Sequence, residues 1–107
     1  MITAEQVLAG VDLAVQASTE EYRKWGGDRG CCGFAWVEVY VDRTNSKQAQ
    51  ELIRAGFKKD YKPKCLSMWN PGGLGVQNID AKEAGADAMA TYLRALGLTA
   101  YAGSRLD

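Results

Sequence analysis

Residues 34–41 restrict the fold more than any other segment, because small apolar and large side chains alternate there without a break. In an extended chain, successive side chains point to opposite faces of a sheet. One face of this predicted strand carries Ala35, Val37, Val39 and Val41, and the other carries Phe34, Trp36, Glu38 and Tyr40. The sequence therefore predicts a sheet with one face on a core and an opposite face of aromatic rings around one carboxylate.

A long N-terminal helix is predicted from its end signals and its apolar spacing. It spans residues 4–25, with Thr3 and Gln6 at the spacing of a capping box and the glycine-rich loop 26–33 after it. Its apolar residues recur at helical spacing: Val7, Val11, Val15, Tyr22 and Trp25. This stripe indicates that the helix packs against another part of the molecule.

Two shorter helices are predicted further along the chain. A helix over residues 46–55 can be capped by Thr44 or Asn45, whose side chains accept hydrogen bonds from the first turn. A helix over residues 81–96 can be capped by Asp80 in the same way. The second of these is rich in alanine and glycine, which favours close approach to a sheet or to a neighbouring helix.

Three further strands complete the predicted sheet. Residues 64–70 and 75–78 are predicted to be extended and to be joined by a turn over residues 70–73, because proline and glycine favour a chain reversal there. The last strand is predicted over residues 98–102, followed by a polar tail over residues 103–107. The element order is therefore α and then β-α-β-β-α-β.

This order predicts an α+β fold, namely a ferredoxin-like βαββαβ antiparallel sheet with an added N-terminal helix. The helix occupies residues 1–25 and the βαββαβ unit occupies residues 34–102. With 107 residues, of which 47% are hydrophobic, the chain is long enough for one core, and it contains no linker or repeat. A single domain over residues 1–107 is expected.

The aromatic face of this sheet is the candidate site. The candidate binding residues are Trp36, Glu38, Tyr40, Trp69, Gln77 and Tyr101, with Arg29 from the adjoining loop. Large aromatic surfaces rarely stay in water, so we expect a cover: the first helix, a second copy of the chain in a homodimer, or another ligand or protein. A carboxylate among rings needs a partner, and Arg29 or Arg105 can pair with Glu38 unless it lies exposed at the sheet edge.

The chain offers few residues for catalysis. It has no histidine, which excludes Ser-His and Cys-His nucleophile pairs and imidazole metal sites. Cys31, Cys32 and Cys65 lack the paired spacing of a structural zinc site, so we interpret them as buried or incidental thiols. We expect no metal and no cofactor, and a small-molecule enzyme using Glu38 or Cys32 remains as an alternative.

The segment Lys58–Lys64 holds four lysines and a tyrosine, a composition that suits contact with single-stranded nucleic acid. Three features count against it. The net charge is zero, from 13 Lys plus Arg and 13 Asp plus Glu; Glu38 lies on the predicted aromatic face; and the chain lacks the RRM signature. Nucleic-acid binding is therefore the less favoured alternative.

The favoured function is a non-catalytic binding module that contacts a protein partner or a small ligand, or self-associates, through the aromatic face. Residues 1–6 lack the basic and apolar regions of a signal peptide, and no apolar stretch approaches the ~20 residues of a membrane-spanning helix. A cytoplasmic protein without membrane contact is expected.

Three segments resemble parts of small, uncharacterised bacteriophage-encoded proteins: Cys32–Val37, Trp69–Gly73, and Lys82–Ala86 running on to Tyr101–Asp107. The resemblance covers less than half of the chain. It implies a compact accessory protein that acts by binding, for instance to a host factor. It implies no activity, cofactor or catalytic residue.

Overall fold

The computed structural model describes residues 1–24, 33–73 and 79–106. In chain order the elements are α1 (Ala4–Lys24), β1 (Gly33–Tyr40), α2 (Lys47–Arg54), β2 (Lys58–Lys59), β3 (Cys65–Trp69), α3 (Ile79–Ala95) and β4 (Thr99–Leu106). The strands form one antiparallel sheet in the order β2-β3-β1-β4, which confirms the predicted α+β class. No helix in these three ranges is long and apolar enough to cross a membrane.

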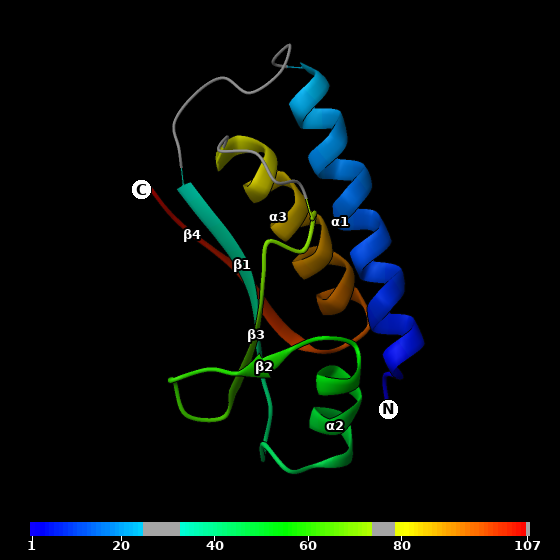
Figure 1. Ribbon diagram of the computed structural model, residues 1–107. Coiled ribbons are helices and arrows are strands. Elements are labelled where there is room, and N and C mark those ends of the chain that lie inside the picture. Colours follow the sequence, from blue (N-terminus) through cyan, green and yellow to red (C-terminus); the bar gives the residue numbers. More distant parts are fainter. Residues whose placement is uncertain (25–32, 74–78, 107) are drawn as a thin grey trace.

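The helices of the described chain lie on one side of the sheet (Figure 1). Val37 and Val39 of β1 and Leu66 of β3 face this side and are fully buried in a core that includes Leu93 of α3. The core is therefore a layer between sheet and helices. The alternation of side chains in residues 34–41 correctly predicted which face of the sheet is buried.

The sheet differs from the prediction at both of its edges. β2 lies in a segment where the sequence predicts no strand. β4 continues to Leu106 through the expected polar tail, because the eight residues of β1 provide backbone partners as far as Gly33, which lies opposite Leu106. The predicted segment 64–70 is confirmed as β3. The predicted strand 75–78 lies outside the described residues.

The first helix packs on α3 rather than on the aromatic side of the sheet (Figure 1). Its buried residues are Ala4, Val7, Gly10, Ala14 and Ser18. Ser18 Oγ donates a hydrogen bond of 2.7 Å to the carbonyl oxygen of Ala81, and a Cβ at Gly85 would collide with Ser18. The predicted stripe is therefore partly wrong, since Val15 is 41% exposed and Trp25 lies outside the described residues.

The start of α1 carries the predicted capping box. The Gln6 N–H donates to Thr3 Oγ1 at 3.2 Å, and the Thr3 N–H donates to Gln6 Oε1 at 2.9 Å. The Ala4 N–H donates to Glu51 Oε1 of α2 at 2.9 Å. The amides of Thr3, Ala4 and Gln6 are thereby satisfied, and α1 is tied to α2 as well as to α3.

The other two predicted caps are wrong by one or two residues. Ser46 caps α2 instead of Thr44 or Asn45, because its hydroxyl accepts a 3.1 Å hydrogen bond from the N–H three residues later. α3 begins one residue before Asp80, so this carboxylate lies inside the first turn rather than at the cap. It still lies near the positive end of the helix dipole.

Candidate functional site

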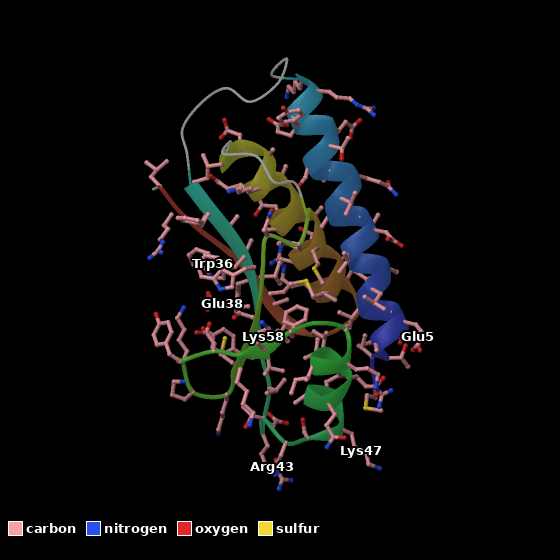
Figure 2. All side chains as sticks on the ribbon, viewed as in Figure 1. Glu5, Trp36, Glu38, Arg43, Lys47 and Lys58 are labelled. Atoms are coloured by element: carbon pink, nitrogen blue, oxygen red, sulfur yellow. The ribbon has the colours of Figure 1, made fainter. Side chains whose placement is uncertain are left out.

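The candidate site is the side of the sheet that points away from the helices, which we call the aromatic face. Its side chains come from β1, β3 and β4: Phe34, Trp36, Glu38, Tyr40, Trp69, Tyr101 and Arg105. Cross-strand partners share a face, and the register places Trp36 opposite Trp69. Figure 2 shows Trp36 and Glu38 on the side of β1 away from α1 and α3.

Most of the predicted site residues meet on this face: Trp36, Glu38, Tyr40, Trp69 and Tyr101. The other two, Arg29 and Gln77, lie outside the described residues. Phe34 and Arg105 belong to the face without having been predicted as site residues. Alternation already placed Phe34 on the same face of the strand, whereas Arg105 fell within the expected tail.

Trp36 and Trp69 form the centre of the aromatic face, and we call them the tryptophan pair. Their ring centroids are 4.9 Å apart, with 32° between the ring planes. The Trp36 indole lies against Gly103 of β4, where a Cβ atom would come within 2.5 Å of Trp36 Nε1. Trp36 therefore lies over a glycine of the neighbouring strand, and Trp69 keeps 54% of its surface exposed.

Further rings flank the tryptophan pair. Phe34 and Trp69 meet at a centroid distance of 6.0 Å, and Arg105 Cζ lies 5.4 Å from the Phe34 centroid and 6.0 Å from that of Trp69. Tyr40 and Tyr101 meet edge to face at 6.0 Å, and Tyr101 is 53% exposed. A guanidinium over aromatic rings is attracted to them, so these contacts hold Arg105 beside the tryptophan pair.

Glu38 accepts hydrogen bonds from Trp36 and from Tyr40, and it is only 7% exposed. Lys62 Nζ lies 2.7 Å from Glu38 Oε1 and 3.1 Å from Oε2. Trp36 Nε1 donates to Oε2 at 3.1 Å, and the Tyr40 hydroxyl donates to Oε1 at 3.2 Å. The partner of Glu38 is therefore Lys62, and the predicted pairing with Arg105 is wrong because that guanidinium contacts the rings instead.

These contacts set the protonation state of Glu38. Burial by itself raises the pKa of Glu38, but the hydrogen bonds from Lys62, Trp36 and Tyr40 and the charge of Lys62 outweigh burial, so the pKa is lowered. The hydrogen bond to Glu38 in turn raises the pKa of Lys62. The two side chains form an ionised pair at neutral pH, and a carboxylate held in this way is a poor general acid or base.

Cys65 is fully buried beside this ion pair. Its Sγ lies 3.8 Å from Glu38 Oε1 and 3.8 Å from Asp60 Oδ2. Burial, together with the negative charges of Glu38 and Asp60, raises the pKa of Cys65 to about 11. In the described ranges these three residues are the one group of potential metal ligands, with donor atoms within 4.8 Å of one another. A protonated thiol and the Lys62 ammonium on the carboxylate do not fit a divalent cation.

The lysine-rich segment 58–64 borders the aromatic face. Lys58 pairs with Ser67, which pairs in turn with Glu38, so Lys58 lies on the aromatic side of the sheet. A shallow hollow of about 250 Å³ is lined by Trp36, Asp60, Tyr61, Lys62, Trp69 and Arg105. The rings and the lysines, which belong to separate alternatives in the sequence, thus form one surface. This surface can hold a flat apolar group on the rings and an anion at the rim.

Three comparisons with known proteins give no relative from which a function can be transferred. No protein-family model matches the chain, and neither a curated protein nor a solved structure matches it.

Proposed function

We propose that this protein is a non-catalytic binding module and that the aromatic face is its recognition surface. The observation that carries the proposal is ring exposure: Trp69 and Tyr101 keep 54% and 53% of their surfaces exposed, while the described helices lie on the opposite side of the sheet. Aromatic side chains dominate binding hot spots because they bury a large area with few rotatable bonds. A face with this many exposed rings is suited to contact with another molecule.

The hydrogen bonds of Glu38 support the proposal because they fix the rings before anything binds. Trp36 is held between Gly103 and the Glu38 carboxylate, and the Tyr40 hydroxyl is held by the same carboxylate. Lys62 keeps the carboxylate charged and in position. Because these side chains are already ordered, binding loses less conformational entropy than it would on a flexible surface.

The proposal includes a ferredoxin-like arrangement for the sheet and the two later helices. It is supported by the order β1-α2-β2-β3-α3-β4 along the chain and by β1 and β3 as the two central strands. In this arrangement both connecting helices lie on one side, which leaves the other side of the sheet for recognition. α1 is an addition that packs on α3.

An enzyme that uses Glu38 or Cys32 is less well supported. Glu38 is ionised and bonded to three neighbours, so it has no ready role in proton transfer. Cys32 lies outside the described residues and adds no support. The accessory role that the bacteriophage resemblance implies and a cytoplasmic location both stay predictions.

Hydroxyl-radical footprinting in an extract of the cells that produce the protein tests the proposal. Oxidation of Trp36, Trp69 and Tyr101 is compared between purified protein and protein in the extract. Leu8 and Leu13 of α1 provide the internal control, because they are 46% and 39% exposed on an element far from the sheet's aromatic side. The ratio of ring to leucine oxidation cancels the scavenging effect of the extract.

A recognition surface requires that ring oxidation falls in the extract while leucine oxidation does not. Equal oxidation ratios in the two samples would contradict the proposal, because a module engaged through these rings cannot leave them fully accessible. Repeating the experiment after removal of small molecules by dialysis separates macromolecular partners from small ligands. Native mass spectrometry of the purified protein identifies a dimer, which would assign the protection to a second copy.

A further inference from the structure

We propose that the aromatic face binds single-stranded nucleic acid, with bases stacked on the exposed rings and phosphates held by Lys58 and Arg105 beside them. This inference rests on the proposed function and names its ligand class. The sequence alone counted against nucleic acid through the net charge, through the carboxylate on the face and through the missing RRM signature. In the structure, neither the zero net charge nor the Glu38 carboxylate opposes the binding of phosphate.

The carboxylate does not repel phosphate, because its charge is already compensated. Glu38 is only 7% exposed, and Lys62 Nζ lies 2.7 Å from its Oε1. The aromatic rings around it carry no charge, and Arg105 lies beside them. The described part of the face therefore presents neutral rings with positive charge on two sides.

The net charge is zero, but the charged side chains are distributed unevenly over the molecule. In segment 58–64, Lys58 lies on the aromatic side, Lys59 lies opposite Leu66 on the helical side, and Lys62 is neutralised by Glu38. The carboxylates of α3 lie on the helical side of the molecule: Asp80, Glu83 and Asp87. There, burial and the charges of Asp80 and Asp87 raise the pKa of Glu83, as expected where acids are close together. Lys58 and Arg105 thus place positive charge beside the rings, and this is the charge complementarity that a phosphate backbone requires.

The chemistry of the rings favours stacking over the reading of base edges. Trp36 Nε1 and the Tyr40 hydroxyl are the polar atoms of their rings, and both already donate to Glu38. Ring faces remain for contact, and every base has a face that stacks on an aromatic side chain. We therefore expect binding with little sequence preference.

The spacing of the rings suits a splayed single strand. On β1, Trp36 of the tryptophan pair lies four residues from Tyr40, which is a separation of about 13 Å along a strand. Sheet surfaces that bind RNA stack two or three unpaired bases on rings of this kind. A duplex keeps its bases stacked on each other and offers no free base face, so the arrangement selects single strands.

Fluorescence anisotropy with fluorescein-labelled 12-nucleotide oligothymidylate and oligouridylate tests the inference. We expect binding at 50 mM KCl that weakens as salt rises, and much weaker binding to a 12-base-pair duplex. Trp69→Ala should weaken binding about 5- to 150-fold, the range for loss of one base–aromatic stack. Trp69 is half exposed, so the variant should keep a cooperative urea unfolding transition.

A charge-matched pair of variants tests the role of Lys58. Lys58→Gln should reduce the slope of log K against log salt by about 0.7, the value for one lost phosphate contact. The matched control, Lys47→Gln, removes the same charge from an exposed position on α2 and should leave the slope unchanged. Figure 2 shows Lys47 on α2, far from Trp36.

Three results would overturn the inference: no binding of either oligonucleotide at 50 mM KCl, unchanged affinity in Trp69→Ala, or an equal change of slope in Lys58→Gln and Lys47→Gln. The footprint in extract separates this failure from failure of the proposed function. Ring protection that persists after nuclease treatment would leave the binding module standing and assign the surface to a protein. Ring protection that disappears with nuclease supports the inference.

Discussion

On β3, Leu66 and Trp69 lie three residues apart and point to opposite faces of the sheet. Leu66 is fully buried against the helices, whereas Trp69 keeps 54% of its surface exposed on the aromatic face. The helical side is filled by close apolar packing. The aromatic side instead contains a charged network, in which Glu38 is bonded to Lys62, Trp36 and Tyr40.

This difference indicates that the two faces contribute to different properties of the protein. Burial of apolar surface supplies most of the free energy of folding, so the helical face determines stability. The network around Glu38 positions rings that remain partly in water, which contributes less to stability and more to the shape of a binding surface. Substitutions on the two faces should therefore separate stability from binding.

The largest separation is expected between Leu66→Ala and Trp69→Ala. Leu66→Ala leaves a cavity in the core and should lower the free energy of unfolding by about 2–5 kcal/mol. Trp69→Ala removes only ring contacts and partly buried area, so about 1 kcal/mol is expected. Urea unfolding followed by circular dichroism measures both. Equal losses in the two variants would show that the aromatic face is part of the core.

A smaller loss is expected from Gly103→Ala. The new Cβ would come within 2.5 Å of Trp36 Nε1, so the indole must move from its position over β4. Crowding of this kind costs about 1–3 kcal/mol. The tryptophan fluorescence spectrum should shift because Trp36 leaves the Glu38 hydrogen bond. Ser104→Ala, at an exposed neighbouring position, is the control, and a shift of the same size there would contradict the assigned contact.

Lys62→Met should mainly change how the stability of the protein depends on pH. The folded-state pKa of Glu38 is lowered below its ordinary value of 4.5, so the folded protein binds that proton less tightly than the unfolded chain does. The resulting stability is present above about pH 4.5 and is lost as the pH falls through the folded pKa. Without the hydrogen bonds and charge of Lys62, the pKa of Glu38 rises from this lowered value, and acid unfolding should begin at a higher pH.

Acid titration of tryptophan fluorescence measures this shift. Lys59→Met provides the control, because Lys59 is exposed on β2 and its cross-strand partner is Leu66 rather than a residue of the aromatic face. The same acid midpoint in Lys62→Met and in the wild type would mean that the ion pair has no effect on Glu38.

The protonation of Cys65 should have the smallest effect on the free energy of unfolding at neutral pH and a measurable effect at alkaline pH. Its pKa is raised from 9.0 to about 11, so the folded protein holds the thiol proton more tightly than the unfolded chain does. The corresponding stability is present below about pH 9 and is lost as the pH rises toward 11. Urea unfolding at several pH values should show this loss, and Cys65→Ala should lack it.

Some features of the molecule were readable in the sequence because they depend on neighbours along the chain. The alternation in residues 34–41 predicts both faces of the sheet, and the spacing of Thr3 and Gln6 predicts the capping box. Ring residues on β3 and β4 follow from the same alternation once the strands pair. These are local patterns with a period of two or of one helical turn.

Other features depend on contacts between distant segments. Lys62 reaches Glu38 across 24 residues from the loop before β3, and nothing local distinguishes it from the other lysines of segment 58–64. The length of β4 depends on pairing with β1, which converts a polar stretch ending at Leu106 into a strand. The position of α1 could not be predicted from the sequence either, because a helix with small residues can pack on a sheet or on another helix.

The closeness of Trp36 and Trp69 has an optical consequence. The two indole centroids lie 4.9 Å apart, and the ring planes are inclined at 32° to each other. The electronic transitions of two indoles this close couple, which produces a paired signal in the circular dichroism spectrum. A molecule that inserts against either ring changes the coupling without any attached dye. The protein therefore contains a label-free spectroscopic reporter at the centre of its own candidate site.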